Sequence, residues 1–382
     1  MAGIYVHVPF CERRCIYCDF YFVTTARSHA PFVRALNAEI EHYGRSHGER
    51  EPIRTVYFGG GTPSRLAAAD VESILNTMRG AFDLSAVEEI TFELNPDDAS
   101  VTYLRALRQM GIDRLSIGIQ SFFADDLAWM NRSHSELQAR QVVDEVRKAG
   151  FENFSIDLIF GLPNQPVEYW AANLERASAL EVPHISTYSL TVEPQTVLGN
   201  QVKRGVVEPA PDEDLAERYL FTMEYLEGRG FEHYEISSFA RPGYRSRHNS
   251  SYWTHANYLG FGPAAHSFWW QGLPARRWSN IRNLRAYEAF VDGGQLPLDL
   301  REDLSLDELA DEYLMLALRT SDGIDLNRME STYGVDLLDE KLEEIAWLEE
   351  AGHIHPVSGS RLRLTREGRT VCDSVARSLL SS

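Results

Sequence analysis

A regular alternation of short apolar runs with longer amphipathic stretches fills the first half of the 382-residue chain. Strands joined through helices run parallel, so this alternation predicts an α/β fold, either doubly wound or closing toward a barrel. The predicted strands, rich in β-branched and aromatic residues, are 4–8, 55–59, 89–94, 114–119, 154–160 and 184–190. The predicted helices are 31–43, 69–82, 101–110, 136–149, 168–180 and 212–229.

The second half departs from this pattern. Residues 238–272 are rich in aromatic and turn-forming residues, and residues 304–382 predict a helix over 307–319, a helix over 337–351, a hairpin through Ser358-Gly359-Ser360 and a last helix from 366. We therefore predict three parts: a core over 1–235, an aromatic-rich covering or linking segment over 236–303, and a small winged-helix-like α+β domain over 304–382.

Charge restricts the partners of the chain. Its 37 Lys and Arg residues against 56 Asp and Glu residues give a net charge of −19, which repels nucleic-acid phosphates. The chain has no apolar run of the roughly 18 residues that a membrane span needs, and no basic region precedes its first apolar stretch. We expect a cytoplasmic protein that binds no nucleic acid and reaches any membrane only transiently, through a protein partner.

Three of the four cysteines, Cys11, Cys15 and Cys18, follow the first predicted strand within eight residues, and Cys372 is most simply a buried thiol. Four cysteines are too few for a disulfide scaffold in a chain of this size, so ligation is the better interpretation of the three. Zinc needs a fourth ligand, which His7 is placed to supply, whereas a [4Fe–4S] cluster on three thiolates keeps one iron open. Ordinary free thiols are the remaining alternative.

Polar residues and glycines follow the predicted strands at the ends where open α/β sheets and barrels build their sites. Gly59-Gly60-Gly61-Thr62-Pro63 follows the second strand, and a glycine run lets backbone groups approach a ligand closely. Glu93 ends the third strand, Gln120 follows the fourth, and Asp157 lies in the fifth. Each alone is as consistent with a helix cap or a core hydrogen bond as with a site.

The context Tyr5-x-His7-x-Pro9-Phe10-Cys11-x3-Cys15-x-Tyr17-Cys18 resembles the radical S-adenosylmethionine (SAM) superfamily, and within it the group related to oxygen-independent coproporphyrinogen III oxidase. The resemblance covers at least the first 235 residues. It implies a partial (β/α)6 TIM-like barrel in which Cys11, Cys15 and Cys18 hold a [4Fe–4S] cluster whose open iron binds SAM. The residues that it implies at the SAM site are Tyr5, Tyr17, Gly60, Gly61, Thr62, Glu93, Gln120, Arg132 and Asp157.

Individual roles at that site are also implied by the resemblance. Arg132 pairs with the SAM carboxylate, Asp157 binds the ribose hydroxyls, and Glu93 and Gln120 hold the ribose and sulfonium region. Tyr5 lies near the cluster and the methionyl group, and Tyr17 contacts adenine through its backbone.

Two departures indicate which branch of the group the chain resembles. The oxidases carry a further cysteine two residues after the third one, where this chain has Phe20, and they carry an N-terminal extension before the first strand. Both departures match the HemW-type haem chaperones. So does the segment 247–253, which fits their His-Asn-x-x-Tyr-Trp motif with His248, Asn249, Tyr252 and Trp253.

That motif is implicated in haem binding in the family. A neutral imidazole such as His248 ligates haem iron, and Tyr252 and Trp253 are suited to lie against the porphyrin. The alternative is a turn followed by aromatic residues packed in the core. His255 and His266 are additional candidate ligands.

We therefore expect a radical-SAM-fold haem chaperone that carries haem as cargo to a recipient haem protein, such as a membrane-bound respiratory complex. The alternatives are an oxygen-independent coproporphyrinogen III oxidase, a radical SAM enzyme acting on another tetrapyrrole or an unrelated substrate, and a zinc-binding α/β protein.

Overall fold

A twelve-stranded sheet organises the molecule in the computed structural model, which describes residues 2–24, 28–48, 51–163 and 165–380. The strand order is β12-β11-β10-β9-β1-β2-β3-β4-β5-β6-β8-β7, and β1 to β6 are parallel neighbours. These six strands are β1 (Ala2–Val8), β2 (Ile53–Gly60), β3 (Glu89–Leu94), β4 (Arg114–Gln120), β5 (Asn153–Phe160) and β6 (His184–Ser189). They confirm the six predicted strands.

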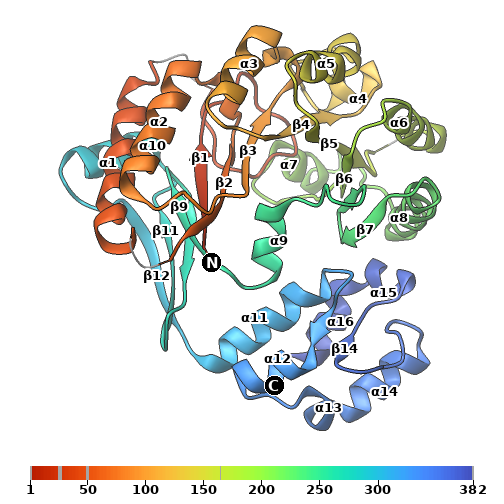
Figure 1. The fold of residues 1–382 in the computed structure, drawn as a ribbon. Helices are drawn as coiled ribbons and strands as arrows, with labels where there is room; N and C mark the ends of the chain where they lie inside the picture. The colour runs from red at the N-terminus through yellow and green to blue at the C-terminus, as the bar shows by residue number, and fades with distance from the viewer. Residues whose placement is uncertain (1, 25–27, 49–50, 164, 381–382) are drawn as a thin grey trace.

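The helices between these strands cover the outer face of the curved sheet (Figure 1). They are α1 (Ala30–His47), α2 (Ala68–Ala81), α3 (Val101–Gln109), α5 (Glu136–Lys148) and α6 (Val167–Ala179), and α8 (Asp212–Glu227) follows β6 on the same face (Figure 1). The short helices α4 (Ala124–Trp129) and α7 (Val197–Lys203) instead pack together in a small separate cluster with Tyr17 of the cysteine loop. Strand residues with apolar side chains are almost all buried, as both faces of a parallel sheet require. The sheet curves as the predicted partial barrel does, but β12 and β7 lie at its two ends and it does not close.

Residues 236–303 extend this sheet. Strands β7 (Glu232–Glu235) and β8 (Ser238–Ala240) pair beside β6, whereas β9 (Asn257–Phe261), β10 (His266–Trp269), β11 (Ala275–Asn280) and β12 (Leu298–Leu304) continue it beyond β1. Here β9 runs parallel to β1. The segment that the sequence suggested as a cover or linker therefore supplies strands to the sheet, together with α9 (Arg247–Trp253) and α10 (Leu284–Asp292).

The last residues form a separate hydrophobic core that also takes in Phe268 and Ala275 from the sheet. Bridges of Ser358 with Arg361 and of Ile354 with Leu364 confirm the predicted hairpin. The single helix predicted over 337–351 is broken at Lys341, and one helix, α12, was not foreseen. The elements are α11 (Leu306–Leu318), β13 (Ile324–Asp325), α12 (Leu326–Tyr333), α13 (Leu337–Glu340), α14 (Leu342–Glu350), β14 (Arg361–Leu362), α15 (Arg366–Thr370) and α16 (Cys372–Leu379).

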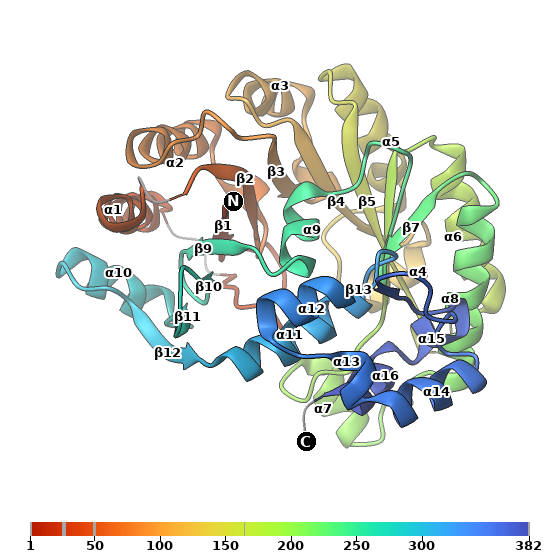
Figure 2. The same ribbon diagram turned by 60° about the horizontal axis from the view of Figure 1, so that its bottom comes forward.

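Helix α9 lies between the sheet and this C-terminal region (Figures 1 and 2), in contact with β2 and β3 on one side and α11 on the other. The division at residues 235 and 303 remains a prediction. No helix among the described residues is both long and apolar enough to cross a bilayer.

Candidate cluster and SAM pocket

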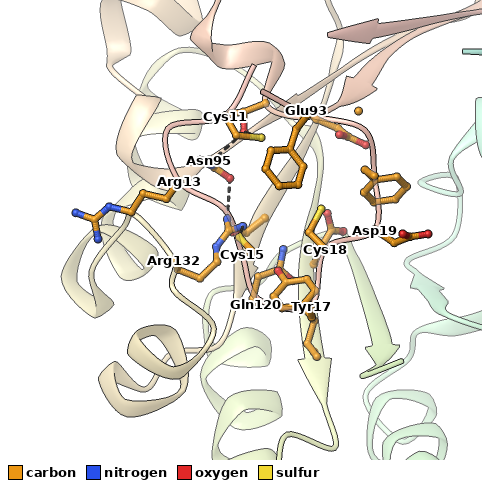
Figure 3. Close-up of a pocket in the computed structure, with 18 of the residues that line it drawn as sticks. Cys11, Arg13, Cys15, Tyr17, Cys18, Asp19, Glu93, Asn95, Gln120 and Arg132 are labelled. Carbon is orange, nitrogen blue, oxygen red and sulfur yellow. Dashed lines mark hydrogen bonds between the residues drawn. The ribbon is translucent and has the colours of Figure 1, made fainter. Parts of the chain in front are cut away.

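The three clustered cysteines line a cavity of about 430 Å³ at the carboxyl ends of the parallel strands (Figure 3). Nearly all of the SAM residues implied by the resemblance line the same cavity, although they come from six separate segments of the chain. They are Tyr17, Gly60, Gly61, Thr62, Glu93, Gln120, Arg132 and Asp157. The structure therefore brings together the residues that the strand-end pattern singled out.

The thiols are half-buried and have polar neighbours. The Thr62 hydroxyl donates to Cys11 Sγ at 3.5 Å, and Nη1 of Arg132 donates to Cys15 Sγ at 3.5 Å. Burial raises the pKa of Cys11 to about 11 and that of Cys18 to about 12, so a metal must displace their protons to bind. Among the described residues, no three His, Cys, Asp or Glu side chains lie close enough to hold one metal ion.

Arg132 places a positive charge on the wall of the cavity. It follows α4, and its Nη2 donates to Asn95 Oδ1 and to the Gly118 carbonyl, both at 2.7 Å. These bonds leave the guanidinium facing the cavity with a fixed orientation, which suits a carboxylate ligand. The sequence assigned no role to Asn95; its place after β3 was the only signal for it.

Two buried oxygens at the cavity have no hydrogen-bond partner among the described residues. They are Gln120 Oε1 and Asp157 Oδ1. Gln120 also has a φ of +66°, a strained backbone for a residue other than glycine, and such strain often accompanies a functional site. Because unpartnered buried polar atoms are costly, a ligand rich in hydroxyl and amino groups fits this wall. A cluster-bound SAM meets that requirement.

Glu93 connects the cavity with the interior of the sheet. It accepts a hydrogen bond from the Tyr57 hydroxyl at 2.6 Å. Burial and, to a smaller extent, the nearby Asp157 carboxylate raise the pKa of Glu93 to about 7, although the hydrogen bond from Tyr57 opposes this shift. A carboxyl with this pKa binds or releases a proton near neutral pH.

The glycines at the end of β2 are also required by the packing of the cysteine loop against that strand. Gly60 has a φ of +106°, and a Cβ there would lie 2.7 Å from the His7 ring. A Cβ on Gly61 would lie 2.9 Å from backbone atoms of Val8, Pro9 and Phe10, at the start of the cysteine loop. The glycines thus let the loop pack directly on β2, in addition to exposing backbone to the cavity.

Tyr5 does not line this cavity. Its ring stacks on Tyr57 with centroids 6.1 Å apart, and it faces a second cavity together with His7 and Tyr252. The contact of Tyr5 with the cluster and the methionyl group therefore stays a prediction. Tyr17, by contrast, is in the main cavity, as expected.

The first residues of the His248 motif lie at the opposite end of the strands. The motif forms α9, whose first backbone N–H groups, those of Arg247 and His248, donate to the buried Glu89 carboxylate at 3.0 and 2.9 Å. Glu89 begins β3, whereas Glu93 near its end faces the cysteine cavity. The motif is thus anchored below the cluster pocket and does not line it.

Both nitrogens of the buried His248 ring are hydrogen-bonded. Nδ1 lies 2.8 Å from Thr55 Oγ1, and Nε2 lies 2.9 Å from the Tyr252 hydroxyl. Burial lowers the pKa of His248 to about 3, so the ring is neutral. It would have to give up one of these bonds to ligate iron.

The other two motif residues are half-buried. Asn249 is in the first turn of α9, where its backbone N–H donates to the Ser246 hydroxyl. Trp253 ends the helix under the Arg319 guanidinium, 5.8 Å from its ring centroid, and faces the C-terminal region. Tyr252 of the motif thus lines a cavity, whereas Trp253 contacts Arg319 at the end of α11.

Comparisons with known proteins agree with this geometry. A family profile described as the Radical SAM superfamily matches residues 5–177, and one described as the HemN C-terminal domain matches residues 304–371. Among solved structures, coproporphyrinogen III oxidase (HemN) from Escherichia coli superposes with a TM-score of 0.83 at 24% identity, covering 99% of this chain and 89% of that one. The fold and the cysteine-lined pocket are those of a radical SAM protein.

Similar proteins of known name show to which family within this superfamily the chain belongs. The chain is 33% identical to the protein named heme chaperone HemW of Bacillus subtilis (strain 168), over 378 residues and 98% of each chain. It is 36% identical over 392 residues to "Radical S-adenosyl methionine domain-containing protein 1, mitochondrial" of Bos taurus, covering 100% of this chain and 87% of that one. The chain belongs to the HemW family, and membership implies a [4Fe–4S] cluster and SAM.

Proposed function

We propose that this protein is a haem chaperone that binds haem and passes it to a recipient haem protein. The observation that carries the proposal is its similarity, over nearly the full length of both chains, to a relative named heme chaperone HemW. The phenylalanine at position 20 supports it, because Phe20 stands where the resemblance places a cysteine in the oxidases.

Cys11, Cys15 and Cys18 would hold the cluster, which supplies an open iron for the amino and carboxylate groups of SAM. Arg132 would orient the SAM carboxylate, and Gln120 and Asp157 would receive its polar groups at their unpartnered oxygens. In this proposal the His248 motif belongs to the haem site. His248 fixes the Tyr252 phenol, which lines the neighbouring cavity.

We place this activity in the cytoplasm and expect a respiratory membrane complex as recipient. The net charge of −19 offers little attraction to anionic lipid, so contact with such a complex would be made through protein surfaces.

Anaerobically reconstituted protein tests the proposal directly. We expect iron and labile sulfide but no zinc, and a Soret band that saturates at one haem per chain. Replacing all three cysteines by alanine should abolish iron binding, whereas Cys372→Ala, which removes a buried thiol of the C-terminal core, should leave it intact. Zinc in place of iron, or no haem binding by the wild-type chain, would contradict the proposal.

A second assay separates the chaperone from the oxidase. The reconstituted protein is given coproporphyrinogen III, SAM and a reductant without oxygen. We expect no decarboxylated product at catalytic turnover; steady product formation would favour the enzyme.

A further inference from the structure

The second cavity is lined by several aromatic side chains together with histidine and arginine. Its volume is about 320 Å³, and aromatic side chains from distant segments line it. A third cavity of about 450 Å³ shares Asp19, Phe20, Tyr21 and Arg282 with it. Ligand pockets combine such apolar walls with a few polar groups that fix orientation. The aromatic lining residues of the second cavity are Tyr5, Phe20, Tyr21, Tyr252 and Tyr258.

Phe20 lies at the centre of this arrangement. Its side chain is 68% exposed, and it lines the cluster pocket as well as both neighbouring cavities. Phe20 therefore adds exposed aromatic surface at the point where the three cavities meet. A flat macrocycle in the second cavity would cover it.

The histidines in and around the cavity differ in their availability to iron. His7 is engaged at both nitrogens, by the Tyr5 hydroxyl at 3.3 Å and the Tyr21 carbonyl at 2.8 Å. His248 is engaged at both as described above, and His255 contacts Tyr333 at 3.1 Å and Glu312 at 3.3 Å. His266 lines the cavity and is exposed, and its imidazole ring has no hydrogen bond or ion pair among the described residues.

His266 is also kept neutral. Burial of part of its ring lowers its pKa, and the positive charges of Arg277 and Arg282 lower it further, partly offset by Glu302. A neutral imidazole presents the lone pair that haem iron requires.

Arg282 supplies a cation at the rim. Its Nη2 donates to the Asp19 carbonyl at 3.1 Å, and it makes no ion pair among the described residues. The Asp19 carboxylate is instead engaged by Gln195, which donates to Oδ1 at 2.9 Å. The remaining guanidinium donors are thus available to a carboxylate.

We propose that haem docks in this cavity with His266 as the iron ligand, Arg282 paired with a propionate, and the ring system against Phe20, Tyr252 and Tyr258. The inference rests on the proposed function and names a different ligand from His248, whose role becomes the positioning of Tyr252.

The test titrates haem into the full-length, cluster-reconstituted chain and into His266→Ala. We expect the variant to lose the absorption and electron-paramagnetic-resonance signature of histidine ligation and to bind haem about tenfold or more weakly, which is about 1.4 kcal/mol. Added imidazole should restore the signature. His355→Ala, an exposed histidine in the C-terminal region, should behave as wild type.

Arg282→Gln provides an independent arm that does not depend on the folding of His266→Ala. Wild type should bind haem roughly 2- to 5-fold more tightly than its dimethyl ester, whereas Arg282→Gln should bind both alike, because an exposed ion pair contributes modestly. If wild type binds no haem, the proposed function fails. If wild type binds haem but both variants match it, only this site assignment is overturned.

Discussion

The hydroxyl of Tyr57 donates a 2.6 Å hydrogen bond to Oε1 of Glu93. The same ring stacks on His248, with centroids 5.0 Å apart and planes 28° apart, and His248 in turn contacts the Tyr252 hydroxyl. One tyrosine therefore contacts a wall residue of the cluster pocket and the helix that carries the family motif. This contiguous path gives the two cavities a physical connection through packed side chains.

Replacing Tyr57 by phenylalanine separates the hydrogen bond from the stacking. We expect the free energy of unfolding to fall by about 1–3 kcal/mol, because the half-buried Glu93 loses one of its hydrogen-bond donors. SAM affinity should fall as well, whereas the haem spectrum should persist, since the ring still supports His248. Chemical denaturation and ligand titrations measure these effects. The control is Tyr103→Phe, which removes a hydroxyl bonded at 3.0 Å to the Leu66 carbonyl and should leave SAM affinity unchanged.

Two substitutions of Gln120 separate the effect of its backbone strain on stability from the effect of its side chain on SAM binding. Its φ of +66° costs a residue with a Cβ about 1–2 kcal/mol. We expect Gln120→Gly and Gln120→Ala to weaken SAM binding alike, by roughly 2- to 12-fold, the value of one hydrogen bond. The glycine variant should nevertheless be about 1 kcal/mol more stable than the alanine variant. Equal stabilities would show that the strain has no cost here.

Gly60→Ala should be strongly destabilising. The new Cβ meets the His7 ring at 2.7 Å, and its φ of +106° disfavours any side chain. We expect a loss of about 2 kcal/mol or more in the free energy of unfolding. Gly80→Ala is the matched control, because it lies in α2 with nothing within 4 Å of its Cβ position and should stabilise the helix by about 0.5–1 kcal/mol. A neutral Gly60→Ala would contradict the packing argument.

Glu39 on α1 gives the stability a pH dependence. Burial raises its pKa to about 7, although it accepts hydrogen bonds from Tyr287 at 2.6 Å, the Gly262 N–H at 2.9 Å and Asn280 at 2.6 Å. The folded state therefore holds the proton more tightly than the unfolded state does. Protonation of Glu39 therefore adds to the free energy of unfolding. This stabilisation is fully present below pH 4.5, the ordinary pKa of a glutamate, and is lost as the pH rises through the folded-state pKa of about 7.

We expect the free energy of unfolding of wild type to fall by about 3 kcal/mol relative to Glu39→Gln between pH 4.5 and pH 8. The titration of Glu93 is common to both proteins and cancels in the difference. Denaturation curves at several pH values measure this difference in the free energy of unfolding. If that free energy varied with pH in the same way for both proteins, Glu39 would not titrate in this range.

Local patterns predicted the parallel core well. Runs such as 154–160 are apolar because both faces of the strand are covered, and Gly111 and Gly150, with φ of +96° and +91°, lie just beyond the ends of α3 and α5. The site residues at the strand ends could also be predicted from the sequence, because parallel strands bring their carboxyl ends to one edge of the sheet. Arg132 came from the resemblance, and its contact with Asn95 joins loops that no local pattern connects.

The contacts of the His248 motif could not be predicted from local sequence patterns. The hydrogen bonds of His248 come from Thr55, nearly 200 residues away, and from its own helix, and the helix is held by Glu89, a buried carboxylate that resembles any surface acid in sequence. The extension of the sheet by β9 to β12 was missed because turn-forming and aromatic residues dominate that stretch, while its strands are short and their pairing is set by tertiary contacts.

Strand β1 lies in the interior of the sheet, between β2 and β9. Its second neighbour, Asn257–Phe261, leaves the ribosome about 250 residues later. At a synthesis rate of about 5–20 residues per second, one edge of the strand next to the cysteine loop stays open for roughly 10–50 s on every nascent chain. Open edges recruit other strands, so the timing of translation and the protection of the emerging polypeptide become part of how this protein reaches its native form.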